Sequence, residues 1–231
     1  PELAWRRRTE WAVEGLRDIA EGVGVLVSRA EPLNRQVCIL YSPENYAMGW
    51  LFGKRKDAWR GLALDGRTRS ENTFIDVLDK LLFIQPRYVT ADEIEAGGLA
   101  GCTLLFLPQA LNLGDATAEA IRAYVRGGGA VVADILPGTR ERCGKPRAES
   151  ALADVFGVRG AGAELHREGE SWYSLGIKYG GENLTWPGEM TWLPGDTWFL
   201  GIEPTTAVAQ GRALSKEGKE APICLANGFG T

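Results

Sequence analysis

Two acidic residues, Glu44 and Asp134, are the groups in this 231-residue chain with which a hydrolase could work. Each follows a short apolar segment, at residues 37–41 and 130–133. A glycosidase needs two carboxylates, about 5 Å apart in a retaining enzyme and about 6.5 to 9.5 Å apart in an inverting one. The alternative is structural: Asp134 would accept hydrogen bonds from loop amides, and Glu44 would cap a short helix behind Pro43. We favour the structural interpretation.

Other polar residues follow the same apolar segments and could bind a ligand. Asn45 comes after the first segment, Gln109 after residues 104–107, and Arg140 in the loop beyond residues 130–133. If these segments are parallel strands, their carboxyl ends meet at one edge, where ligands bind in open α/β sheets. The sequence therefore predicts a ligand-binding set that consists of Glu44, Asn45, Gln109, Asp134 and Arg140.

The cysteines and the one histidine do not form a pattern that predicts a metal site or a cofactor. No two of the four cysteines have C-x-x-C spacing, and His166 stands alone. Without a histidine nearby, a cysteine also lacks the base that a nucleophile requires. We predict inert thiols, typical of a cytoplasmic protein. The cysteines are Cys38, Cys102, Cys143 and Cys224.

Residues 158–200 are glycine-rich and dense in tryptophan. Pro-Gly pairs within them indicate turns, so we expect a β-rich insertion. Tryptophan rings present flat apolar faces that suit sugar rings, but they also contribute strongly to cores and interfaces. Packing against another domain or subunit is the preferred interpretation, with direct sugar contact as the alternative. The side chains concerned are Trp172, Trp186, Trp192 and Trp198.

The elements that must position these groups centre on residues 103–138. Leu104–Leu107 is a short apolar run without alternation, which is typical of a strand buried on both faces. A helix with one apolar face follows from Asp115, and the triplet Gly127–Gly129 ends it. Ala130–Ala133 then forms a second buried strand. A strand–helix–strand unit of this length is a right-handed crossover, so we predict a parallel sheet.

The rest of the chain fits around this unit. Residues 2–27 have one apolar stripe at helical spacing and are followed by a linker, so residues 1–34 are predicted to be a helix and linker apart from a domain at 35–231. We also predict strands at 37–41 and 87–89, a helix capped by Ser70, short helices at 91–99 and 151–156, and a closing hairpin of residues 206–209 and 222–226.

Bulk composition excludes two classes of partner. The net charge is −4, whereas nucleic acids and anionic membranes attract basic surfaces. No apolar run approaches the roughly 18 residues of a membrane span. We therefore expect neither nucleic acid nor membrane as a partner. Because the chain starts at Pro1 rather than Met and stops in a turn-like tail, we also expect a piece of a longer protein, and the cysteine usage favours a cytoplasmic one.

Three stretches resemble a known domain: FIDVLDKL at 74–81, the whole of residues 103–138, and LADVFGV at 152–158. Together they are similar to the domain that follows the catalytic barrel in family 42 β-galactosidases and related putative glycoside hydrolases, over residues 35–157. The resemblance implies a class I glutamine-amidotransferase-like fold, which is a flavodoxin-like three-layer sandwich, and a role in trimerisation. It also implies that residues 1–34 are the end of a preceding barrel.

The resemblance further implies that this domain is not catalytic. Where class I amidotransferases carry a nucleophilic cysteine, this chain has Asp134, and the glycines of the oxyanion site are replaced by Pro108–Ala110. The expected partners are its own barrel and identical subunits, with carbohydrate as a further possibility. Two alternatives stay open: a carbohydrate- or small-ligand-binding module, and a stand-alone hydrolase that uses Glu44 and Asp134.

Overall fold

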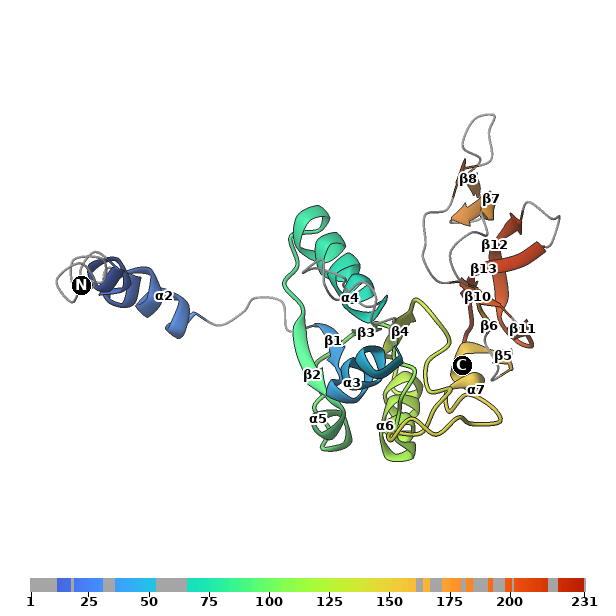
Figure 1. Ribbon diagram of the computed structural model, residues 1–231, viewed down its shortest axis with the longest axis horizontal. Coiled ribbons are helices and arrows are strands. Elements are labelled where there is room, and N and C mark those ends of the chain that lie inside the picture. Colours follow the sequence, from blue (N-terminus) through green and yellow to red (C-terminus); the bar gives the residue numbers. More distant parts are fainter. Residues whose placement is uncertain are drawn as a thin grey trace. The chain divides into compact units, whose positions relative to one another are not determined.

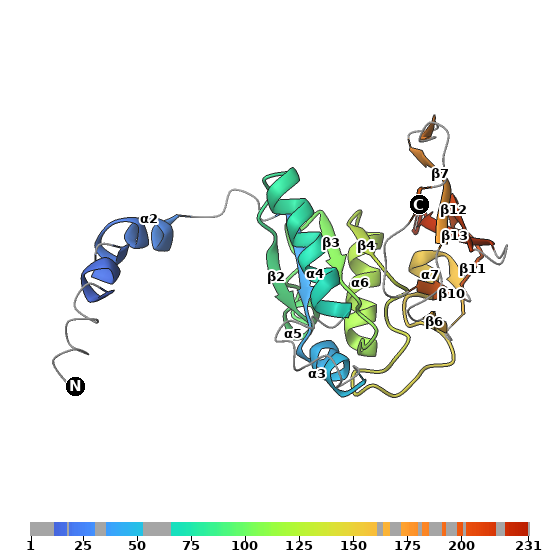
Figure 2. The same cartoon turned by 45° about the horizontal axis from the view of Figure 1, so that its top comes forward.

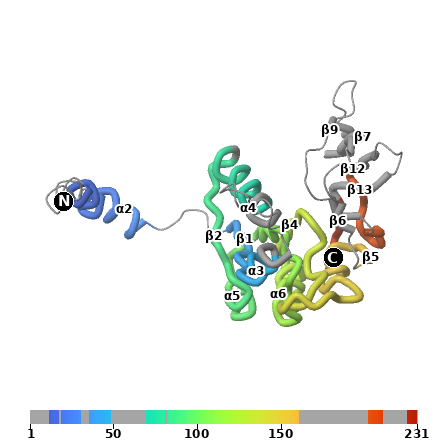
Figure 3. Tube along the Cα trace, viewed as in Figure 1, coloured from blue at the N-terminus to red at the C-terminus, as the bar shows by residue number. Residues whose placement is uncertain are grey.

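The computed structural model divides the chain into two compact units, Pro1–Asn34 and Arg35–Thr231, which are described separately. Figures 1 and 3 follow the chain from its first residue to its last. The residues that the structure describes are 12–17, 19–30, 36–52, 66–160, 164–166, 172–179, 182–184, 191–192, 198–200, 202–215 and 220–230.

The first unit is helical, and its apolar stripe faces solvent. Residues 12–17 and 19–21 are helical, and α2 (Val23–Arg29) continues them. Leu16 is 65% exposed and Leu26 is 71% exposed. An isolated helix of this length is marginal in water, so this stripe needs an apolar partner.

The second unit is built on a four-stranded parallel sheet in the order β2-β1-β3-β4, as the apolar segments predict. The registers place Ile39 beside Tyr88 on one side and Phe106 on the other. Figure 1 shows helices on both sides of these strands, so the fold is a flavodoxin-like α/β sandwich. The strands are β1 (Val37–Tyr41), β2 (Arg87–Thr90), β3 (Leu104–Leu107) and β4 (Ala130–Ala133).

One face of the sheet holds the main apolar core. Leu105 and Leu107 of β3 are fully buried there against Ile121 and its neighbours. In the described part of the chain, three helices cover this face, and α5 begins with a reciprocal cap between Thr90 and Glu93. They are α5 (Ala91–Glu95), α6 (Asp115–Arg126) and α7 (Ala153–Phe156).

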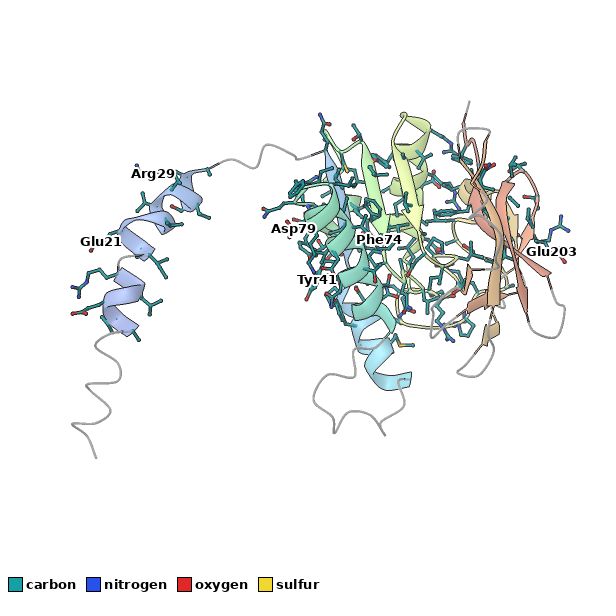
Figure 4. The ribbon with its side chains drawn as sticks, turned by 90° about the horizontal axis from the view of Figure 1, so that it is seen from above. Glu21, Arg29, Tyr41, Phe74, Asp79 and Glu203 are labelled. Atoms are coloured by element: carbon teal, nitrogen blue, oxygen red, sulfur yellow. The ribbon has the colours of Figure 1, made fainter. Side chains whose placement is uncertain are left out.

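The other face is covered by α4 (Gly66–Asp76), which continues as the π-helix η2 (Val77–Leu81). Phe74, labelled in Figure 4, packs on Phe106 of β3 with 5.0 Å between ring centroids. The predicted cap at Ser70 is wrong, because α4 begins at Gly66 and Ser70 lies within the helix. α3 (Pro43–Phe52) follows β1 at the carboxyl edge of the sheet, as Figure 2 shows.

Beyond α7 the chain is β-rich, as its turns and tryptophans predict. β12 (Val208–Ser215) and β13 (Glu220–Ala226) form the expected hairpin, with β12 longer than predicted. β12 also pairs with β7 (Trp172–Tyr179). The remaining strands are β5 (Val158–Arg159), β6 (Glu164–His166), β8 (Glu182–Leu184), β9 (Thr191–Trp192), β10 (Trp198–Leu200) and β11 (Glu203–Pro204).

Asn227, just after β13, ties the end of the hairpin to α7. Its side-chain Nδ2 donates to the carbonyl of Val155 at 2.9 Å, and its Oδ1 accepts from the Thr206 hydroxyl at 2.9 Å. Gly157 ends α7 in the left-handed region, with φ 61°, and its carbonyl accepts from the amides of residues 205–207. A Cβ at Gly157 would lie 2.5 Å from Asn227 Cγ, so the close approach requires glycine.

No helix in the described ranges is long and apolar enough to cross a membrane.

Candidate functional site

The candidate site lies at the carboxyl ends of β1 and β3. These strands are neighbours in the sheet, but β1 leads to β2 on one side while β3 leads to β4 on the other. The order of the strands reverses here, and in open α/β sheets this switch point is where ligands bind. The segments that meet at this edge are residues 42–45, 108–113 and 134–147.

Asn45 joins the end of β1 to the segment that follows β3. Its side-chain Oδ1 accepts from the backbone amide of Asn112 at 2.8 Å, and its Nδ2 donates to the Asn112 carbonyl at 3.1 Å. The same Nδ2 donates to the Ser42 hydroxyl at 2.7 Å. Asn45 is 5% exposed, so its carboxamide is fully committed to protein partners. Asn45, predicted to bind a ligand, therefore holds the backbone of this edge together.

Glu44 is ion-paired rather than poised for acid catalysis. Its Oε1 accepts from Nε of Arg142 at 2.8 Å, and its Oε2 accepts from the Ser42 hydroxyl at 3.1 Å. Partial burial alone would raise the pKa of the Glu44 carboxyl, but its own backbone amide, Arg142 and Ser42 outweigh burial and lower that pKa. A general acid near neutral pH needs a raised pKa instead.

Arg142 bridges two elements. Besides Glu44, it donates through Nη2 to Asp92 of α5 at 2.8 Å. The pKa of Arg142 is raised, chiefly by the hydrogen bonds to these two carboxylates. Residue 142 belongs to the loop after β4, so this bridge fixes that loop over the end of β1.

Asp134, directly after β4, accepts hydrogen bonds on both oxygens. Oδ1 accepts from the backbone amide of Gln109 at 2.8 Å, and Oδ2 accepts from the Ser70 hydroxyl of α4. Gln109 has φ 37°, which is rare for a residue with a side chain. The Asp134 carboxylate thus holds a tight turn, as the structural interpretation of Asp134 predicts.

The two predicted carboxylates belong to separate networks. The side chain of Glu44 contacts Ser42 and Arg142, whereas that of Asp134 contacts Gln109 and Ser70, and each carboxylate has both oxygens occupied. Glu44 and Asp134 therefore fit structural roles, one in an ion pair and the other in hydrogen bonds, better than the roles of acid and nucleophile around one substrate.

Arg140 shapes the loop after β4. Its Nη1 donates to the carbonyl of Gly144 at 2.9 Å, and its backbone pairs with Leu111 and Leu113 on either side of Asn112. Residues 111–113 therefore form a short extended segment between the Asn45 side chain and the backbone of Arg140.

Two residues of this edge, Asn112 and Arg142, were missed at the sequence level. Neither directly follows a strand, so the rule that selects strand ends does not reach them. Arg142 is 98 residues from its partner Glu44, and Asn112 is 67 residues from Asn45. One signal was present: Asn112 is a polar residue between two leucines, both of which are at least half-buried.

The Cys38 thiol is not activated. Burial and the neighbouring Cys102 raise the pKa of the Cys38 thiol to about 12, against the opposing effect of Arg87. Cys38 and Cys102 are buried and Cys143 is exposed. Among the described residues, no group of three potential ligands could hold a metal ion. The backbones of Trp172, Trp192 and Trp198 lie in strands β7, β9 and β10. Trp186, and the side chains of all four tryptophans, fall outside the part of the chain that the structure describes.

The second unit has a flavodoxin-like α/β fold, and comparison with solved structures identifies proteins that share this fold. The chain superposes on Gan42B, a GH42 β-galactosidase from G. stearothermophilus, in its catalytic mutant form, with a TM-score of 0.59 and 17% identity over 86% of this chain. It superposes on the cold-adapted β-galactosidase from Rahnella sp. R3 with a TM-score of 0.62 and 17% identity over 85% of this chain.

These matches cover 26% and 27% of the β-galactosidase chains, so this chain spans about a quarter of their length. At this identity the likeness establishes a shared fold. No protein-family model matches the chain. No curated protein sequence is significantly similar to it.

Proposed function

We propose that this chain is a non-catalytic accessory domain of a larger glycoside hydrolase of the β-galactosidase kind. In this proposal it packs against its own catalytic barrel and against identical subunits. The observation that carries the proposal is the shared fold with about a quarter of two GH42 β-galactosidase chains.

The strand ends support a non-catalytic role. The class I amidotransferase-like fold would place a nucleophile where Asp134 stands, and Asp134 is held by the Gln109 amide and the Ser70 hydroxyl. A carboxylate that anchors a turn through both oxygens is a poor substitute for a thiolate with a histidine base. Glu44, the other acidic candidate, is neutralised by Arg142. Neither residue favours the stand-alone hydrolase.

The apolar stripe of the first unit supports packing against another domain. Leu16, Ile19, Val23 and Leu26 are each 58–71% exposed and repeat at helical spacing. An exposed stripe of this kind on a soluble protein marks an interaction surface. A preceding barrel is the partner that we propose for it, in agreement with the resemblance.

Two measurements on the purified chain test this role. Light scattering reports assembly, and the proposal expects masses that are multiples of the 25.1 kDa chain as concentration rises. A dye that fluoresces on apolar surfaces reports the stripe: the dye should bind the wild type and bind a Leu16→Glu, Leu26→Glu variant less. The matched control, Arg17→Glu with Arg29→Glu, changes the charge of the same helix and should leave dye binding unchanged. A chain that stays monomeric, with equal dye binding in all three proteins, would contradict the role in packing.

A further inference from the structure

Among the described residues, three buried side-chain atoms lack a hydrogen-bond partner, and all three lie at the β1/β3 edge. They are Nδ2 and Oδ1 of Asn112 and Nε of Arg147. Asn112 is 4% exposed. A buried polar group without a partner costs about 1–3 kcal/mol, and such groups are rare in native proteins. Their concentration in one place therefore calls for a specific partner.

The two residues belong to adjoining segments. Arg147 donates through Nη2 to the carbonyl of Leu113, the residue after Asn112, at 3.0 Å. The same Nη2 pairs with Asp115 Oδ1 at 2.7 Å. These two contacts fix the guanidinium, and with it the unpaired Nε, beside the segment that carries Asn112.

The carboxamide of Asn112 is directed away from the main core. Residues 111–113 are extended, because Asn112 forms a parallel bridge with Arg140 and its own backbone pairs with the Asn45 side chain. Successive side chains of an extended segment point to opposite sides. Leu113 enters the apolar core against α6, so the Asn112 side chain points to the opposite side of the edge.

The surrounding hydrogen bonds hold this side chain ready for a partner. Asn45 grips both backbone groups of Asn112, and Asp134 grips the Gln109 amide three residues earlier, where φ is 37°. A strained residue other than glycine that is held by its neighbours is a common feature of binding sites. The position also coincides with the switch point of the sheet, where ligands bind in this class of fold.

We propose that the Asn112 carboxamide is the base of a binding subsite for a neutral ligand with neighbouring hydroxyl groups, that is, a sugar or polyol. The unpaired atoms comprise an amide donor, an amide acceptor and a guanidinium donor. A hydroxyl group both donates and accepts, so two adjacent hydroxyls satisfy this set.

Charge at this edge disfavours an anionic ligand. With Asp92 and Asp115 included, the edge holds five carboxylates and four cationic groups, and ion pairs with Arg142, Lys145 and Arg147 occupy most of them, so no cluster of free positive charge is available for an anion. The groups counted are Glu44, Asp92, Asp115, Asp134 and Glu141, and Arg140, Arg142, Lys145 and Arg147.

Saturation-transfer NMR on the full chain tests the subsite, with D-galactose, D-glucose and glycerol as probes and 1-propanol as a probe without neighbouring hydroxyls. The wild type should give a saturable signal with at least one of the three polyhydroxyl probes and none with 1-propanol. Asn112→Leu has nearly the same shape but no polar atoms, and it should weaken binding by about tenfold or more. The control Gln85→Leu removes an exposed amide before β2 and should bind as the wild type does.

The test has clear negative outcomes. No saturable signal with any polyhydroxyl probe, or equal binding by wild type and Asn112→Leu, would overturn the subsite. A buried water alone predicts the first of these results. If Asn112→Leu does not fold, Asn112→Asp keeps the shape and replaces the amide donor with an acceptor. Weaker binding by that variant supports the subsite, and unchanged binding overturns it. If glycerol binds as tightly as galactose, the ligand is a polyol, and if galactose alone binds, it is a sugar. Both results support a site for neighbouring hydroxyl groups. Because the assembly measurements do not involve this edge, either proposal can fail without the other.

Discussion

The clearest single perturbation of this edge is Asn45→Ala. The substitution removes three hydrogen bonds, to the Ser42 hydroxyl and to the amide and carbonyl of Asn112, at distances of 2.7, 2.8 and 3.1 Å. Asn112 is 4% exposed, so its backbone groups lose their partner in a site that water hardly reaches. A direct bond is worth about 1 kcal/mol, and each stranded buried group costs about 1–3 kcal/mol.

The expected loss of unfolding free energy is therefore about 3–6 kcal/mol. For a chain of this size, each kcal/mol lowers the melting temperature by about 2–4 °C, so the midpoint should fall by about 6–24 °C. Urea unfolding followed by the fluorescence of the eight tryptophans measures the loss, with an unchanged slope as the sign that the native state is still compact.

Gln85→Ala is the matched control, because it truncates an exposed amide at the opposite edge of the sheet. Its effect should stay within about 0.5 kcal/mol. A loss below about 1 kcal/mol for Asn45→Ala would show that Asn45 does not hold the two segments together, and the account of this edge would be wrong.

Three further predictions concern the Glu44 ion pair, the turn at Gly157 and the exposure of the cysteines. Arg142→Ala should raise the pKa of Glu44, which NMR titration measures. In the wild type the pKa of Glu44 is lowered by folding. Glu44 therefore stabilises the fold at pH values above its unfolded pKa, and this stabilisation is lost as the pH falls through the folded pKa. Gly157→Ala should destabilise the chain by about 2–4 kcal/mol in urea, from left-handed strain and the displaced Asn227 contact. Iodoacetamide at neutral pH should modify Cys143 and leave Cys38 intact in native protein, as peptide mass spectrometry would report.

Each of these has a result that contradicts it. An unchanged Glu44 pKa would mean that Arg142 does not pair with it in solution. Gly101 has φ 76° and open space for a Cβ, so Gly101→Ala measures the backbone strain alone, and an equal loss for both glycine variants would remove the role of the close approach. Alkylation of Cys38 at the rate of an exposed thiol would contradict its burial.

The sheet could be predicted from the sequence because its signals are local. Each strand is a short apolar run bounded by glycine or polar residues, and Gly127 marks the end of α6 just before β4. The parallel direction followed from the length of the crossover. The start of α4 was missed because residues 66–69 have no apolar periodicity, although Asp65, directly before Gly66, is a residue type that often caps helices.

The residues at the strand ends could be located from the sequence, but their contacts depend on partners that are distant in the sequence. Asp134 meets Ser70 across 64 residues and Glu44 meets Arg142 across 98. No spacing rule reaches that far. The unpaired carboxamide of Asn112 is a property of packing, so it emerges from the structure alone.

The most direct test of the central claim is hydrolysis of a chromogenic galactoside by the purified chain of residues 1–231. We expect a rate equal to that of buffer, and the same rate for Asp134→Ala and Glu44→Gln, because both carboxylates serve as structural anchors. Turnover by the wild type that either substitution abolishes, while the variant remains folded, would contradict the account and identify a stand-alone hydrolase.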